Sequence, residues 1–227
     1  MPINEIGTVG TLGQGLVSGV FKEGLIDPSG ALVVMDFYTK ASLDGKGYQV
    51  RAGTITTPLV GDVVITDTAA EYCVDPAAGF TWLPVYNNIT IRLSTGTLHE
   101  YAIKSVAGAS SAGTAFVLLS TSMPAITASG ATARVQAAGA VTVTAELATT
   151  TRRHWEWSNP AAGFTGALPG DWHQEWNPRL LPRISSTTAS ASCLYVQVAA
   201  TGTGPSYYAH MDGFLFPTSA LGALPTA

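Results

Sequence analysis

The chain has 227 residues, of which 46% are hydrophobic and 11% are charged, and its formal net charge is −4. This length fits one large β domain or two small ones, and the charged share is well below the usual quarter. The 11 basic residues are scattered, so the sequence lacks the basic run that binds nucleic acid, and we expect no strong direct binding to a genome. Low charge is typical of a surface that neighbouring subunits cover, although a secreted β-protein with a Ser/Thr-coated surface would look similar.

The N-terminal segment, residues 1–15, is rich in glycine and weakly patterned. It lacks the basic segment and apolar block of a signal peptide, and no apolar stretch of the chain predicts a transmembrane helix. Ile3 and Ile6 are unusually apolar for a solvated tail. We therefore predict that residues 1–15 form an extended arm that becomes ordered on a neighbouring subunit; a disordered tail is the alternative.

Apolar runs and alternating patterns predict about ten β-strands along the chain. In chain order they cover residues 16–21, 31–39, 48–56, 62–67, 80–93, 98–106, 114–121, part of 132–147, 192–200 and 207–216. Turn signals separate them, as at residues 27–30 and 43–47, and no amphipathic helix stands out. The expected class is all-β, with an antiparallel β-sandwich of the jelly-roll type over residues 16–217 and a C-terminal tail over residues 218–227.

Residues 72–106 carry the clearest strand signals. Apolar and polar residues alternate strictly from Asn88 to Leu93, as expected for a half-buried strand. Gly96 then supplies a residue suited to a tight turn, and residues 98–106 form the returning strand. We predict a long hairpin here that acts as the frame of the sandwich.

The composition changes over residues 154–183, which contain four of the five tryptophans together with four prolines. This composition predicts a long Trp-rich loop rather than regular structure. The two cysteines, Cys73 and Cys193, lie far apart in the sequence within candidate strands, and without an export signal we expect two buried free thiols rather than a disulfide.

The segment with four tryptophans contains two copies of the pattern H-x-E-W. Residues two apart in an extended chain share a face, so each copy would place an imidazole beside a carboxylate. The candidate metal ligands are His154 and Glu156 in the first copy and His173 and Glu175 in the second. Metal-binding cupins share the jelly-roll architecture, but their H-x-H pattern with a following Glu is absent, so we expect no metal, no other cofactor and no catalytic residue. A metal-dependent cupin-like enzyme stays open as an alternative.

The same tryptophans offer two other interpretations. Trp155, Trp157, Trp172 and Trp176 could stack on sugar rings while nearby carboxylates bind hydroxyls, which would make the domain a carbohydrate-binding module. Tryptophan is also enriched in protein interfaces. We favour the second interpretation, and predict an interface formed by these four tryptophans together with Ile3 and Ile6.

The whole pattern resembles viral jelly-roll capsid proteins, and is closest to the single jelly-roll capsid proteins of icosahedral phages with an internal membrane. The likeness rests on the charge-poor β domain, the Gly-rich N-terminal segment, long strands such as residues 80–93, the closing run at residues 207–217 and an uncharged tail. The resemblance implies a structural protein of the virion that assembles in the host cytoplasm. Its partners would be copies of itself and other shell proteins, in proximity to an internal membrane, with no small-molecule substrate and no enzymatic activity.

Overall fold

The computed structural model describes residues 12–17, 20–24, 37–94, 98–122, 127–136, 140–158, 171–175 and 182–221. The chain divides into two compact units, residues 1–43 and residues 44–227. In the first unit, β1 (Leu12–Val17) and β2 (Val20–Gly24) form an antiparallel pair, and α1 (Phe37–Leu43) is a short helix. The predicted limits of the arm, the domain and the tail remain predictions.

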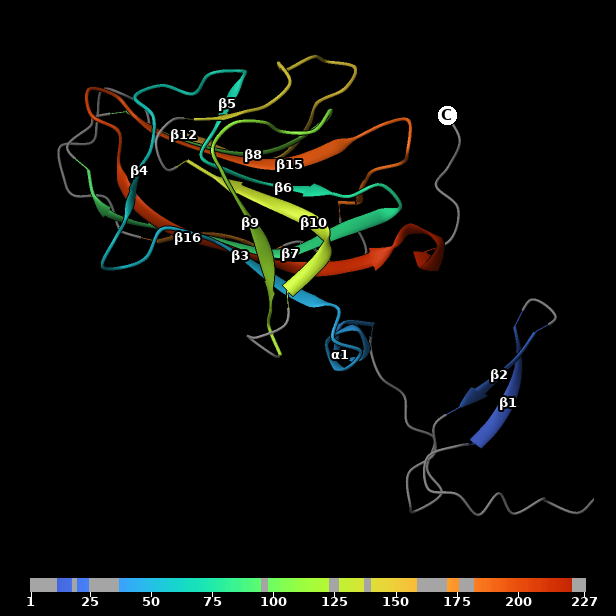
Figure 1. Ribbon diagram of the computed structural model, residues 1–227. Coiled ribbons are helices and arrows are strands. Elements are labelled where there is room, and N and C mark those ends of the chain that lie inside the picture. The colour runs from blue at the N-terminus through green and yellow to red at the C-terminus, as the bar shows by residue number, and fades with distance from the viewer. Residues whose placement is uncertain are drawn as a thin grey trace, which may run out of the picture. The chain divides into compact units, whose positions relative to one another are not determined.

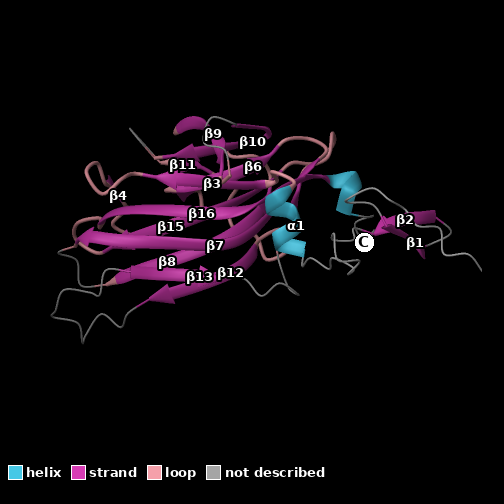
Figure 2. Cartoon of the chain, turned by 90° about the horizontal axis from the view of Figure 1, so that it is seen from below, coloured by secondary structure: helices cyan, strands magenta, loops and turns pink. Residues whose placement is uncertain are grey.

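In the described part of the second unit, the regular secondary structure is almost entirely β-strand, which confirms the all-β class (Figure 2). Its strands are β3 (Gly47–Ala52), β4 (Leu59–Val60), β5 (Ala69–Ala70), β6 (Tyr72–Pro76), β7 (Phe80–Leu93), β8 (His99–Ala107), β9 (Thr114–Ser120), β10 (Thr127–Val135), β11 (Val141–Thr142), β12 (Arg152–Ser158), β13 (Asp171–Glu175), β14 (Ile184–Ser185), β15 (Ser192–Ala200) and β16 (Ser206–Pro217). A 3-10 turn, η1 (Thr218–Leu221), follows the last strand.

The main sheet is antiparallel and curls on itself. Its strands follow the order β12-β8-β15-β6-β10-β9-β3-β16-β7-β13, with β14 beside β7 and β4 beside β16. The sheet bends at β10 and β9, so the half formed by β12, β8, β15 and β6 stacks over the half formed by β3, β16, β7 and β13 (Figure 1). We call these the upper half and the lower half. Together they form a β-sandwich with one closed side.

The main core lies between the two halves. Alternate residues of each strand point inward, and both halves contribute large side chains that are fully or almost fully buried. From the upper half come Tyr72, Val74, Tyr101, Ile103, Leu194, Val196 and Val198, and from the lower half come Trp82, Ile89, Ile91, Tyr207, Met211 and Leu215.

A second, smaller core covers the outer face of the upper half. The short pair β5–β11 lies in this layer, and the buried cluster contains Ala70, Val141, Val143, Val106 and Tyr195 together with both cysteines. Strand β15 is therefore buried on both faces, which explains its nearly continuous run of apolar residues. Cys73 and Cys193 are buried free thiols, as predicted.

The predicted hairpin over residues 72–106 is wrong in its pairing. Strand β7 occupies the predicted residues 80–93, but it lies between β16 and β13 in the lower half. Strand β8 lies between β15 and β12 in the upper half. The connection between β7 and β8 therefore crosses from one half to the other. Alternation along a segment indicates a strand, but it does not identify the neighbouring strand.

Other predicted elements also differ from the structure, and residues 16–21, predicted as one strand, are divided between the end of β1 and the start of β2. Residues 37–39 of the predicted strand at 31–39 lie in α1, and residues 31–36 lie outside the described residues. Residues 62–67 form no strand, because only Asp62 makes an isolated bridge, to Ala199, and Val63 and Val64 are exposed. The strand predicted within 132–147, with an interruption near Gly139, appears as β10 and β11, but β10 already begins at Thr127.

The predicted Trp-rich loop over residues 154–183 is also wrong where it is described. Residues 152–158 form β12 and residues 171–175 form β13, while residues 159–170 and 176–181 lie outside the described part. Proline and glycine around these segments suggested a loop, but aromatic residues favour strands, and the ladders to β8 and β7 stabilise them.

Candidate functional site

The two H-x-E-W copies lie on different edges of the main sheet. The first copy is in β12, which pairs with β8, and the second begins in β13, which pairs with β7. Strands β12 and β13 stand at opposite ends of the strand order. The fold therefore assigns one copy to the upper half and the other to the lower half.

The tryptophans of the first copy pack against the core. Trp155 and Trp157 are half-buried, and their ring centroids lie 6.4 Å and 5.4 Å from that of Tyr101. Trp172 is in register with Ile89, but its side chain is not described. Trp176, Ile3 and Ile6, which complete the predicted interface, lie outside the described residues.

His154 and Glu156 are separated by a β-bulge. The register of β12 against β8 shifts between Arg153 and Trp155. The His154 Nε2 atom lies 2.8 Å from Ser105 Oγ, whereas Glu156 Oε1 lies 3.8 Å from Lys104 Nζ. Consecutive residues of a strand face opposite sides, so the bulge removes the expected placement of imidazole beside carboxylate. Burial lowers the pKa of His154, which favours the neutral ring.

The second copy is described only in part. His173 is in register with Asn88, and Glu175 is exposed and in register with Tyr86. Within the described ranges, no group of three or more His, Cys, Asp or Glu side chains is placed to hold a metal ion.

A network of charged side chains connects β8, β12 and the segment before β12. The Lys104 side chain is only 6% exposed, and its Nζ lies 2.7 Å from Glu146 Oε2. Arg153 Nε donates to Glu146 Oε1 at 2.7 Å and lies 3.4 Å from Glu156 Oε1. The hydrogen bond from Lys104, followed by that from Arg153, lowers the pKa of Glu146. The lysine is thus compensated by two carboxylates although it is buried.

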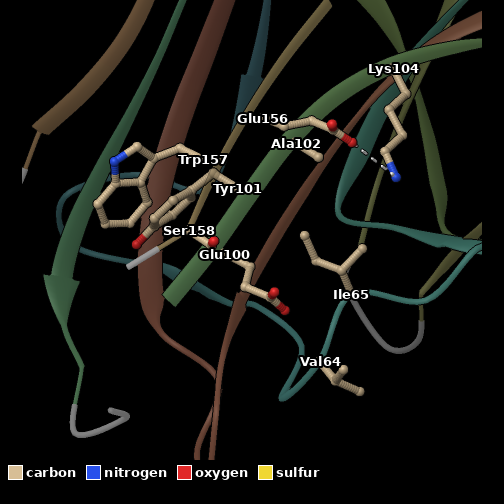
Figure 3. A pocket seen from close by; sticks show the side chains of 9 residues that line it. All are labelled: Val64, Ile65, Glu100, Tyr101, Ala102, Lys104, Glu156, Trp157 and Ser158. Carbon is tan, nitrogen blue, oxygen red and sulfur yellow. Dashed lines mark ion pairs between the residues drawn. The ribbon is translucent and has the colours of Figure 1, made fainter. Parts of the chain in front are cut away.

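Next to this network lies a cleft with a volume of about 490 Å³ (Figure 3). Glu100, Ala102 and Lys104 project into it from one face of β8, and Glu156 and Ser158 border it from β12. Val64 and Ile65 form the opposite wall. Tyr101 and Trp157 line the cleft as well, with their rings away from Val64 and Ile65 (Figure 3), so its lining contains charged, aliphatic and aromatic residues. We call it the β8–β12 cleft.

A second cleft of about 590 Å³ borders the same charge network. Its lining includes Asp67, Glu146 and Arg153. The segment of residues 61–68 contributes to both clefts, through Val64 and Ile65 to the first and through Asp67 to the second.

Sequence reasoning missed the buried carboxylate that holds this segment. Glu71 is 2% exposed, and its two oxygens accept hydrogen bonds from the backbone N–H groups of Asp62 and Val198. The available signal was a single acidic residue immediately before the apolar run of β6. Such a residue is rarely buried unless it is paired or hydrogen-bonded.

The chain matches no known protein-family model, no curated protein and no solved structure. In the part of the chain that is described, no helix has the length and apolar character needed to cross a membrane.

Proposed function

We propose that this protein is a structural subunit that self-assembles into a viral shell, either as a capsid subunit or as a decoration protein, and that its second unit is a jelly roll. The strand order of the main sheet is the observation that carries this proposal. The connections, the surface and the composition agree with it.

Eight of the strands fit the jelly-roll order when they are numbered in the order in which they occur. These strands are β3, β6, β7, β8, β12, β13, β15 and β16. With these numbers, the lower half has the order 1-8-3-6, from β3 to β13, and the upper half has the order 2-7-4-5, from β6 to β12. These are the orders expected for the two interlocked Greek keys of a jelly roll. Strands β9 and β10 are inserted between the fourth and fifth strands and join the two halves at one side.

The second support is a group of exposed aliphatic side chains at one end of the lower half. Val60 and Leu93 are both in register with Ser206, one on each side of it, and they are 57% and 65% exposed. We call Val60 and Leu93 the end patch. Exposed aliphatic groups that lie together are typical of surfaces that associate.

The composition agrees with a subunit that is surrounded by neighbours. A charged share of 11% is low for a protein whose whole surface faces water. Its partners would be copies of itself and other shell proteins in the virion. The net charge of −4 suits a shell that a membrane or another protein layer separates from nucleic acid.

Self-assembly is tested by measuring the mass of the purified protein by light scattering over a wide range of concentrations, together with negative-stain electron microscopy. We expect oligomers or particles. The double variant Val60→Asp with Leu93→Asp should shift the distribution towards monomers, whereas Val117→Asp, at an exposed position of β9, should not. A protein that stays strictly monomeric at high concentration contradicts the proposal.

A further inference from the structure

The wall of the β8–β12 cleft is a segment that is fixed at its two ends. We call residues 61–68 the strap. At its start, Gly61 N–H donates to the carbonyl of Pro205 at 2.9 Å, and Asp62 N–H donates to that of Val198 at 3.0 Å. At its end, the Gln197 side chain donates to the carbonyl of Thr66 at 2.6 Å, and Val143 N–H donates to that of Thr68 at 3.0 Å.

The middle of the strap is the part that faces the cleft. Val63 and Val64 are each 53% exposed, and Val64 and Ile65 lie opposite the β8 side chains (Figure 3). The strap forms no continuous ladder with the neighbouring strand β15, because its β-pairing there is a single isolated bridge between Asp62 and Ala199. Segments with exposed side chains and few ladder bonds are those that open locally at low cost.

Glu71 fixes the start of the strap from inside the protein. Its Oε1 accepts from Asp62 N–H at 3.2 Å and its Oε2 accepts from Val198 N–H at 2.8 Å, so one carboxyl group ties the strap to β15. Among the described residues, its contacts are with backbone amides and not with a cation. The carboxyl of Asp62 carries the nearest acidic charge.

The electrostatics of this contact depend on protonation. Burial raises the pKa of Glu71 well above its ordinary value, and the charge of Asp62 raises it further, although the backbone N–H groups act in the opposite direction. Burial also raises the pKa of Asp62, against a hydrogen bond from Gln136. The other titratable groups facing Glu71 are Tyr72 of β6 and Tyr207 of β16, and desolvation raises the pKa of both. They stay neutral over the range in which the carboxyls titrate.

We propose that the strap is a pH-operated wall of the β8–β12 cleft, and that Glu71 and Asp62 form the latch that holds it closed. With Glu71 protonated, the latch contains at most one negative charge and the strap stays on β15. When both carboxyls are charged, they repel each other in a site without a compensating cation, and the strap detaches. The wall formed by Val64 and Ile65 then moves away from Glu100 and Lys104. This inference does not rest on the proposed function.

The sign of the effect follows from the direction of the shift. When the pKa of a carboxyl is higher in the folded state than in the unfolded state, its protonated form stabilises the closed strap. This stabilisation is complete at pH values below the unfolded-state pKa. That stabilisation is lost as the pH rises through the folded-state pKa. The strap is therefore closed in acid and opens towards alkaline pH.

The test is amide hydrogen exchange measured by NMR between about pH 5 and pH 9, expressed as protection factors to remove the intrinsic pH dependence. The reporters are the backbone N–H groups of Asp62, Val198 and Ala200. Asp62 N–H donates to the Val198 carbonyl and to the Glu71 carboxyl, and Val198 N–H donates to the Glu71 carboxyl. Ala200 N–H donates to the Asp62 carbonyl. We expect the protection factors of all three to fall together as the pH rises from about 5 to about 9. The N–H of Tyr195, in the centre of β15, reports on global stability and should not change.

Variants separate the latch from other causes. Glu71→Gln keeps the size of the side chain and should make the protection factors independent of pH. Asp62→Asn removes the repelling charge and should make the fall in protection with rising pH smaller. If Glu71→Gln does not fold, Asp62→Asn alone tests whether the two carboxyls form the latch. Asp67→Asn changes a carboxyl elsewhere on the strap and should behave as the unmodified protein does. Protection that is constant with pH in the unmodified protein, or that falls equally in Glu71→Gln or in Asp62→Asn, overturns the proposal.

Discussion

Tyr72 of β6 donates a buried hydrogen bond to the side-chain carbonyl of Asn87 in β7, and this bond joins the upper half of the sandwich to the lower half. Both residues are almost completely excluded from solvent. A polar contact in this position is favourable only while both partners are present, because either group alone would remain buried without its partner. It therefore fixes how the two halves face each other.

Removal of this hydroxyl gives a first prediction. In Tyr72→Phe, the Asn87 carbonyl loses its donor in the core, so the free energy of unfolding should fall by about 1–3 kcal/mol. The measurement is urea denaturation at neutral pH. Tyr208→Phe, at a partly exposed position of β16, is the control and should change it by less than about 0.5 kcal/mol. Equal effects of the two substitutions would contradict the role given to the bond.

The charge network gives a second prediction. Lys104 is buried and bonded to Glu146, so Lys104→Met should lower the free energy of unfolding by about 1.5–3 kcal/mol, the range for hydrogen bonds to charged groups. Arg153 is 57% exposed, and Arg153→Met should cost at most about 1 kcal/mol, as for surface ion pairs. Thermal and urea denaturation of both variants check that the loss of unfolding free energy is larger for Lys104→Met than for Arg153→Met. A larger effect at Arg153 than at Lys104 would contradict it.

The same network makes stability depend on pH in a defined direction. The pKa of Glu146 is lower in the folded state than in the unfolded state. Its contribution to the free energy of unfolding is therefore fully present at pH values above the unfolded-state pKa, and it is lost as the pH falls through the folded-state pKa. Glu146→Gln should therefore flatten the acid side of the pH–stability curve. The check is a series of urea denaturations from about pH 3 to pH 7, where the unfolded carboxyl titrates. An unchanged acid side in Glu146→Gln would show that other groups control it.

The cysteines give a fourth prediction, that both remain reduced and unreactive in the folded protein. Cys73 is in register with Tyr195, so Cys193 occupies a diagonal position on the neighbouring strand. Diagonal neighbours are about 7–8 Å apart, which is more than the roughly 4.4–6.8 Å between the Cα atoms of most disulfides. Burial also raises the pKa of the Cys73 thiol to about 12. A thiol-specific reagent should label neither cysteine before denaturation and both after it; rapid labelling of the folded protein would contradict this.

A fifth prediction concerns the close approach of β16 to Trp82. A Cβ atom at Gly213 would lie 2.5 Å from the Trp82 ring and 2.6 Å from the carbonyl of Leu83. Gly213→Ala should therefore lower the free energy of unfolding by about 1–3 kcal/mol, the range for overpacked cores. Calorimetric melting checks this. In Gly45→Ala the new Cβ meets no neighbour, so any loss of unfolding free energy comes only from the positive φ of 68°. Comparing the two variants separates the effect of overpacking from that of backbone strain.

The sequence predicted the strands that are specified by their own pattern. Apolar and polar residues alternate in the second half of residues 80–93, and residues 192–200 are apolar almost throughout. Both segments appear as strands with those limits. The partners of β7 and β8 could not be predicted, because each half of the sandwich requires the same pattern. Strands β12 and β13 were missed because their neighbours in the sequence include proline and glycine, while their stability comes from ladders with distant strands.

The candidate site was predicted even less completely, for a related reason. A regular strand would place His154 and Glu156 on the same face, but the bulge between Arg153 and Trp155 changes which face each side chain occupies. A bulge inserts one residue without a clear local signal. The contacts of Glu71 depend on Asp62 and Val198, and no local pattern joins these three residues.

The position of β16 has a consequence for protein synthesis. This strand, residues 206–217, lies between β3 and β7, so the lower half lacks its central strand until these residues leave the ribosome. During translation, β3 and β7 expose long unpaired edges of the kind that aggregate. Pairing between such distant segments is slow to form. We therefore expect the nascent chain to complete its sandwich only late, and to need protection from self-association until it does.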